Sequence, residues 1–162
     1  MGKTPDITIV PLIKEDLDQV MIIEKASFSM PWSRNLFLGE FRNKPISLML
    51  AALSDVEPRI VAGYIVCWVF VDEVHILDLA TDPALRRKGV GRQVVLAALR
   101  LAYDWGARKA FLEVRESNRP ALKLYKDLGF VQTHVREDYY DLPVENAIVM
   151  TLSTEDLRRL LA

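Results

Sequence analysis

Three apolar runs rich in strand-forming residues lie close together between residues 46 and 81, and they constrain the fold of this chain more than any other feature. Ile46–Leu53 and Ile60–Val71 flank Asp55-Val56-Glu57-Pro58, whose residue types favour a tight turn. Strands joined by a short turn pair antiparallel. The third run, Glu73–Thr81, follows almost at once, so we expect antiparallel pairing throughout this part of the sheet.

The segments around these runs alternate between helical and strand periodicity. A stripe of apolar residues at helical spacing runs from Val90 to Trp105 and ends at Gly106. Because two of the helices would connect strands by crossovers, the sheet should be mixed. The other expected strands are Ile7–Val10, Lys109–Arg115, Phe130–Arg136 and Asn146–Leu152. The other expected helices are Glu15–Ser27, Arg34–Phe41 and Thr154–Leu161, the last with a Thr-x-Asp start that resembles a cap. A further helix is expected between Ser117-Asn118, which can cap its start, and Gly129, which ends it.

This order, β-α-α-β-β-β-α-β-α-β-β with a late helix, predicts an α/β (α+β) fold. We expect a mixed sheet of about six to seven strands flanked by helices. The length suits a single domain spanning residues 1–162, with a core at about 7–152 and a short C-terminal helix at 154–161.

Composition excludes several classes of protein. The net charge of −1, from 21 basic and 22 acidic side chains, lacks the basic excess of a nucleic-acid binder. The single cysteine, Cys67, lies in an apolar run, which favours a buried small side chain over a catalytic thiol.

The N-terminal residues lack the apolar core of a signal peptide, and no apolar stretch approaches ~20 residues, so we expect a cytoplasmic protein with no membrane partner. Cys67 and the two histidines, His75 and His134, show no metal-ligand spacing, and we predict no metal.

A basic, glycine-containing segment stands between the strand that Pro83 ends and the helix that follows. Its residues are Arg86, Arg87, Lys88, Gly89, Val90, Gly91 and Arg92. A helix start exposes unpaired N–H groups and the positive end of the helix dipole, and glycines let a ligand approach the backbone. The segment therefore favours a diphosphate site over a plain turn with solvated charges.

The kind of diphosphate is less constrained by the motif itself. No P-loop pattern is present, and Val94 occupies the place of the third glycine in a dinucleotide fingerprint. Glu113 falls about 20 residues farther on, as that fingerprint requires, which leaves a non-catalytic nicotinamide- or flavin-binding module open.

Glu113 is a carboxylate in the middle of an apolar strand, between Leu112 and Val114. It can be a general base, directly or through water, or it can form an ion pair with Arg115 or another cation. His75 is a weaker candidate for a second base. Tyr125 lies on an apolar helical stripe, and the pattern alone favours core packing for it.

Arg86-x-x-Gly89-x-Gly91 resembles the Gln/Arg-x-x-Gly-x-Gly/Ala motif of the Gcn5-related N-acetyltransferase (GNAT) family, and the resemblance extends over roughly Ile7 to Leu152. The stretches Pro31-Trp32-Ser33, Leu112-Glu113-Val114-Arg115 and Tyr139-Tyr140 are similar to the RimI branch, bacterial enzymes that acetylate the N-terminal alanine of a small-subunit ribosomal protein. The resemblance implies a GNAT-like, mostly antiparallel sheet and acetyl-CoA as co-substrate.

The resemblance also implies roles for particular residues. Glu113 would accept the proton of the acceptor amine, and Tyr125 would protonate the departing thiolate. Residues implied to bind acetyl-CoA are Leu79, Ala80 and Thr81 at the pantetheine arm, Arg86 with Arg87, Lys88, Gly89, Val90, Gly91 and Arg92 at the pyrophosphate, and Asn118.

For the acceptor, the residues themselves suggest candidates. Trp32, Tyr139 and Tyr140 could line a peptide groove or be ordinary core and edge residues, and Arg136 beside the tyrosine pair could position the acceptor. Glu73 could attract a cationic N-terminus or belong to a solvated turn. We expect acetyl transfer to the α-amino group of a protein, a ribosomal protein by resemblance, from a monomer or weak dimer. A small-molecule amine such as a polyamine, aminoglycoside or amino acid is the alternative acceptor.

Overall fold

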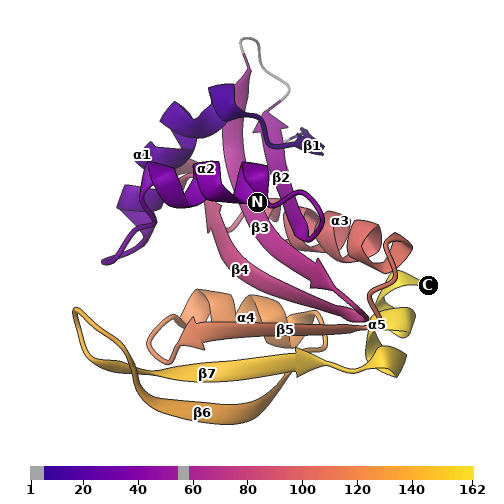
Figure 1. Cartoon of the computed structure of the whole chain (residues 1–162). Helices are drawn as coiled ribbons and strands as arrows, with labels where there is room; N and C mark the ends of the chain where they lie inside the picture. The colour runs from indigo at the N-terminus through magenta and orange to yellow at the C-terminus, as the bar shows by residue number, and fades with distance from the viewer. Residues whose placement is uncertain (1–5, 55–58) are drawn as a thin grey trace.

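The computed structural model describes residues 6–54 and 59–162. Within these residues it contains seven strands and five α-helices, arranged as one twisted sheet with helices on both faces (Figure 1). The strands are β1 (Ile7–Pro11), β2 (Ser47–Ser54), β3 (Ile60–Phe70), β4 (Glu73–Thr81), β5 (Lys109–Arg115), β6 (Val131–Tyr140) and β7 (Glu145–Leu152). The helices are α1 (Leu17–Ser27), α2 (Arg34–Arg42), α3 (Val90–Asp104), α4 (Arg119–Asp127) and α5 (Thr154–Leu161), with 3-10 turns η1 (Lys14–Asp16) and η2 (Pro83–Leu85).

The sheet has the strand order β1-β2-β3-β4-β5-β7-β6. Every neighbouring pair is antiparallel except β4 and β5, which are parallel because α3 crosses over between them. The mixed, mostly antiparallel fold and the predicted order of elements are therefore confirmed. The turn predicted at residues 55–58 lies outside the described residues.

Apart from shifts of one residue at several element ends, the structure differs from the prediction at three places. The first helix starts with η1, so α1 begins at Leu17 rather than Glu15. β6 continues past Arg136 to Tyr140, and because it is an exposed edge strand its sequence carries no apolar alternation that could mark its end. The cap of α5 is Ser153, whose hydroxyl accepts from the Asp156 N–H, rather than Thr154.

The sheet buries apolar side chains on both faces. Ile65, Cys67 and Val69 of β3 belong to the core beneath α3, α4 and α5, whereas Tyr64 and Val66 belong to the core beneath α1 and α2. A strand covered on both faces reads as a continuous apolar run, which explains the composition of this segment. Cys67 is fully buried, as predicted.

The strands β4 and β5 pair over only part of their length. Pairing joins Glu73–Ile76 to Lys109–Leu112, and no further pair follows toward their C-terminal ends. On the other side of β4, Val66 pairs with Asp78 and the next residue, Cys67, pairs with Ile76, so the strand has an irregularity at Leu77. Beyond this point the two strands diverge, which Figure 1 shows as a wedge between β4 and β5. Among the described residues, no helix combines the length and apolar character needed to span a membrane.

Candidate active site

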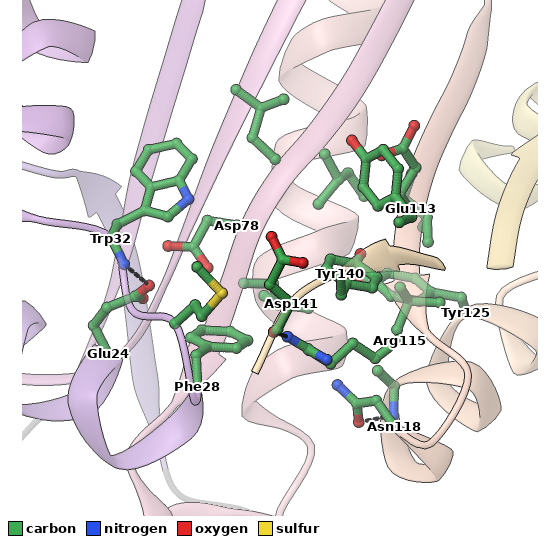
Figure 2. Close-up of a pocket in the computed structure, with 18 residues that line it drawn as sticks. Glu24, Phe28, Trp32, Asp78, Glu113, Arg115, Asn118, Tyr125, Tyr140 and Asp141 are labelled. Carbon is green, nitrogen blue, oxygen red and sulfur yellow. Dashed lines mark hydrogen bonds between the residues drawn. The ribbon is translucent and has the colours of Figure 1, made fainter. Parts of the chain in front are cut away.

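The wedge between β4 and β5 contains the first of three cavities, with a volume of about 370 Å³. We call it the central cavity. Both predicted catalytic residues line it, although Glu113 comes from β5 and Tyr125 from α4 (Figure 2). The opposite wall includes Glu24, Phe28 and Trp32 from α1 and the segment after it. Divergence of the strands thus brings together side chains from both halves of the chain.

Glu113 is held by neighbours on β6. Its Oε1 lies 3.0 Å from Arg136 Nε, and its side chain is 30% exposed. The hydroxyl of Tyr139 also hydrogen-bonds to Glu113, which is the main reason that the pKa of Tyr139 is raised. The ion pair considered with Arg115 does not form, because Arg115 contacts Glu145 at 3.1 Å and the backbone oxygen of Asp141 at 2.6 Å. Glu113 therefore has a fixed orientation and a cationic neighbour.

Tyr125 combines the two roles weighed for it. Its ring packs edge-on against Phe130 at a centroid distance of 5.5 Å, and the residue is buried. It nevertheless lines the central cavity. Burial raises the pKa of Tyr125, so its hydroxyl stays protonated at neutral pH and is available as a donor.

The second cavity, of about 460 Å³, lies at the start of α3. We call it the coenzyme cavity, because all but one of the residues predicted to bind acetyl-CoA line it. Those lining residues are Leu79, Ala80, Thr81, Arg86, Arg87, Gly89, Val90, Gly91, Arg92 and Asn118. Lys88 is the exception, and it is exposed. Phe28, Leu79, Asn118 and Ala121 line both this cavity and the central one, so the two adjoin.

Backbone conformation shapes the coenzyme cavity. Gly89 has φ of 82° and ends the loop in a left-handed conformation, after which α3 begins at Val90. The side chain of Arg86 donates to Thr81 O at 3.2 Å and to Ser27 Oγ at 2.8 Å, which ties the end of β4 to the end of α1. Asn118 caps α4 by accepting from the Ala121 N–H at 3.3 Å. The first residues of α3, whose N–H groups have no partner within the helix, line this cavity.

The third cavity, of about 430 Å³, lies on the other side of Glu113. Trp32, Arg136, Tyr139 and Tyr140, four of the residues predicted to contact the acceptor, line it together with His75. We call it the acceptor groove. The fifth, Glu73, lines none of the three cavities and instead lies 2.8 Å from His75 Nε2. The carboxylate expected to attract a cationic acceptor is therefore not in the groove.

Sequence reasoning missed two carboxyl groups that line the central cavity, Glu24 and Asp78. They are 1% and 7% exposed. Both occupy buried positions of otherwise apolar patterns. Glu24 follows Leu17 and Val20 on the buried stripe of α1, and Asp78 continues the buried alternation of β4, although the irregularity at Leu77 turns it to the opposite face from Ile76. A charged residue at a core position of an amphipathic pattern was the signal that could have revealed them.

The two carboxyl groups lie together on one side of the central cavity (Figure 2). Glu24 Oε1 accepts from the Trp32 N–H at 2.9 Å, and Glu24 Oε2 accepts from the Tyr64 hydroxyl. Desolvation, together with the charge of Glu24 and a hydrogen bond to it, raises the pKa of Asp78 well above its usual value. Within residues 6–54 and 59–162, no group of three or more His, Cys, Asp or Glu side chains is placed to hold a metal ion.

Comparison with known proteins gives one family and close structural neighbours. The model of the acetyltransferase (GNAT) family matches residues 17–130. The ribosomal protein bS18-alanine N-acetyltransferase of Salmonella typhimurium is 33% identical over 147 residues, which covers 90% of this chain and 96% of that protein. The crystal structure of the ribosomal-protein-S18-alanine N-acetyltransferase from Escherichia coli superposes with a TM-score of 0.82 at 29% identity, covering 92% of this chain and 94% of the other. Ard1 from Thermoplasma volcanium has a TM-score of 0.82 at 30% identity, covering 91% and 97%.

Proposed function

The chain belongs to the acetyltransferase (GNAT) family and is an N-acetyltransferase that uses acetyl-CoA, and on that premise we propose that its acceptor is the N-terminal α-amino group of a protein. The relatives named for acetylating ribosomal protein bS18 at its alanine support bS18 as that protein, because they align with nearly the whole chain. The aromatic lining of the acceptor groove beside Glu113, from Trp32, Tyr139 and Tyr140, also suits a peptide.

The coenzyme cavity has the features that the pyrophosphate of acetyl-CoA requires. Arg87 and Arg92 supply positive charge, and the N–H groups at the start of α3 supply hydrogen-bond donors. Leu79 to Thr81 lie where β4 has separated from β5, so their backbone can pair with the amide groups of the pantetheine arm as an added strand would. The thioester would then lie where the coenzyme and central cavities adjoin.

In the proposed reaction, Glu113 takes a proton from the acceptor amine, directly or through water. A terminal α-amino group has a pKa of about 7.7–8.0, so a modest base suffices. The neutral nitrogen attacks the thioester carbonyl, a C–N bond forms, and the C–S bond breaks. Tyr125 gives its hydroxyl proton to the departing thiolate. The second proton, which the nitrogen loses as the amide forms, returns through water to the Tyr125 oxygen, and Glu113 releases its proton to solvent. The position of both side chains on the central cavity, from different elements, is the observation that carries this mechanism.

The acceptor can be tested by screening short peptides that differ in their first residue, with release of coenzyme A thiol as the readout. We expect fastest turnover with an unblocked N-terminal alanine in the sequence context of bS18, and none with the same peptide already acetylated. Cys67 is buried and burial raises its pKa, so the protein contributes little to the thiol signal. Acetylation of polyamines, aminoglycosides or free amino acids in place of peptides would contradict the proposed acceptor.

A further inference from the structure

Asp78 has an unsatisfied oxygen that the fold alone does not explain. Its Oδ2 is buried, with no hydrogen-bond partner within the described part of the chain. An unpaired buried carboxyl oxygen costs about 1–3 kcal/mol or more. Such a group in a native structure calls for an explanation, and a functional role that brings it a partner is one.

The neighbouring Glu24 is different, because its structural role is visible. Its two oxygens accept from the Trp32 N–H and the Tyr64 hydroxyl, and these bonds fix the turn between α1 and α2. Replacing Asp78 by an apolar residue would leave those contacts in place. Structural need therefore accounts for Glu24, whereas the contacts of Asp78 with Glu24 and the Leu79 backbone leave its Oδ2 unused.

The charges around Asp78 also lack a balancing cation. Within residues 6–54 and 59–162, no lysine, arginine or histidine forms an ion pair with Asp78 or Glu24. The titratable groups that interact with Asp78 are Glu24 from α1, Tyr64 from β3 and Tyr125 from α4, none of which carries positive charge. Glu113, in contrast, is already neutralised by Arg136. The central cavity thus contains, together with Glu113, an acidic pair that has no cation beside it among the described residues.

We propose that Asp78, supported by Glu24, is the anchoring group for the amino group of the acceptor. The inference rests on the proposed function and names the subsite that receives the amine. An α-ammonium group supplies what this subsite lacks, namely N–H donors and positive charge. Asp78 lines the central cavity, and the soft terminal torsion of an aspartate lets either oxygen turn toward it. The subsite recognises the primary amino group and takes over the role that the sequence suggested for Glu73.

The test compares two peptides on two proteins. One peptide begins with alanine, and the other carries a propionyl group in its place and so lacks only the amino group. Binding of each to the enzyme saturated with coenzyme A is measured by calorimetry. For the unaltered protein we expect the loss of the amino group to weaken binding about tenfold or more. For Asp78→Asn we expect the alanine peptide to bind about tenfold more weakly and the two peptides to differ less than twofold.

Kinetics supplies the second readout. In Asp78→Asn, KM for the alanine peptide should rise while KM for acetyl-CoA stays within about twofold. Asp78→Ser should show the same two changes, which separates loss of the carboxyl group from any effect of Asn on packing. Glu24→Gln, as a change in a positioning residue, should raise the peptide KM by a smaller factor. Asp127→Asn on the exposed surface of α4 is the matched control and should match the unaltered protein.

The outcomes separate the two proposals. If the unaltered enzyme acetylates no peptide, the proposed function fails whatever Asp78 does. If it acetylates peptides but both Asp78 variants fold, bind acetyl-CoA and keep the original peptide KM, the proposed function stands and the anchoring role is wrong.

Discussion

At the scale of single residues, Glu113 and Tyr125 should be separable from coenzyme binding. Glu113→Gln removes the proton acceptor and Tyr125→Phe removes the proton donor, while each keeps nearly the same shape. We expect each change to lower kcat at least about tenfold and to leave the Kd for acetyl-CoA within about twofold. Stopped assays of thiol release and equilibrium titration with acetyl-CoA measure the two quantities. Unchanged turnover in both variants would remove both residues from the mechanism.

The buried carboxyl group of Asp78 should also make the stability of the protein depend on pH. Its pKa is raised in the folded protein, so between its usual value near 3.8 and the raised value the native state holds a proton that the unfolded chain has released. Stability contributed by this group therefore falls as the pH rises. Asp78→Asn cannot ionise, so we expect it to be more stable than the unaltered protein at pH 8, with the difference shrinking as the pH falls toward 4.

Urea unfolding at several pH values between 4 and 8 checks this expectation. A pH-independent difference between the two proteins would mean that the buried carboxyl group is not the cause. A gain in stability together with weaker acceptor binding would identify Asp78 as a group kept for function at the expense of stability.

At the scale of elements, the sequence was most informative where periodicity and burial coincide. β4 and β5 match their predicted bounds, because Glu73–Thr81 and Lys109–Arg115 alternate regularly between inward and outward positions. β6 was predicted too short, because every position from Val131 to Tyr139 is exposed and the sequence therefore shows no alternation of apolar and polar residues there. The coenzyme segment was predictable because its chemistry lies in one continuous stretch, Arg86–Arg92. The Asp78–Glu24 pair was not, because it depends on contact between residues far apart in the chain.

The junction of β3, β4 and α3 leads to a prediction of its own. A Cβ added at Gly63 of β3 would lie 2.9 Å from Ala80 O and 3.2 Å from Val90 Cγ1. Both neighbours line the coenzyme cavity, so Gly63→Ala must push β4 or α3 away from its place. We expect a loss of about 1–3 kcal/mol in unfolding free energy and weaker binding of acetyl-CoA.

The control for that variant is Gly39→Ala in α2, where an added Cβ meets nothing within 4 Å. Because glycine is unfavourable inside a helix, this change should stabilise the protein by about 0.5–1 kcal/mol and leave acetyl-CoA binding unaltered. Thermal unfolding and equilibrium titration of both variants provide the comparison. Equal behaviour of the two alanine variants would mean that the junction tolerates movement.

At the scale of the whole molecule, the central cavity follows from the divergence of β4 from β5 and shares lining residues with both other cavities. The coenzyme cavity takes its wall from β4 and α3, the central cavity from β4, β5 and α4, and the acceptor groove from β5 and β6. Coenzyme and acceptor can therefore enter from opposite sides of the sheet and meet beside Glu113. This arrangement suits direct transfer between two bound substrates, since the amine reaches the thioester without an acyl-enzyme.

A thermal-shift panel tests the coenzyme site in the intact protein. A ligand that binds only the folded state at 100 times its Kd stabilises it by about 2.7 kcal/mol, which for a chain of this size corresponds to a rise in Tm of roughly 5–10 °C. We expect this rise with acetyl-CoA and none with NAD or FAD, because the wedge suits a pantetheine arm and Val94 replaces the third glycine of a dinucleotide site. Arg92→Ala should reduce the shift by removing a cation from the coenzyme cavity, whereas Arg158→Ala in α5 should not. A rise with NAD or FAD that exceeds the rise with acetyl-CoA would place the nucleotide-binding alternative ahead of the transferase.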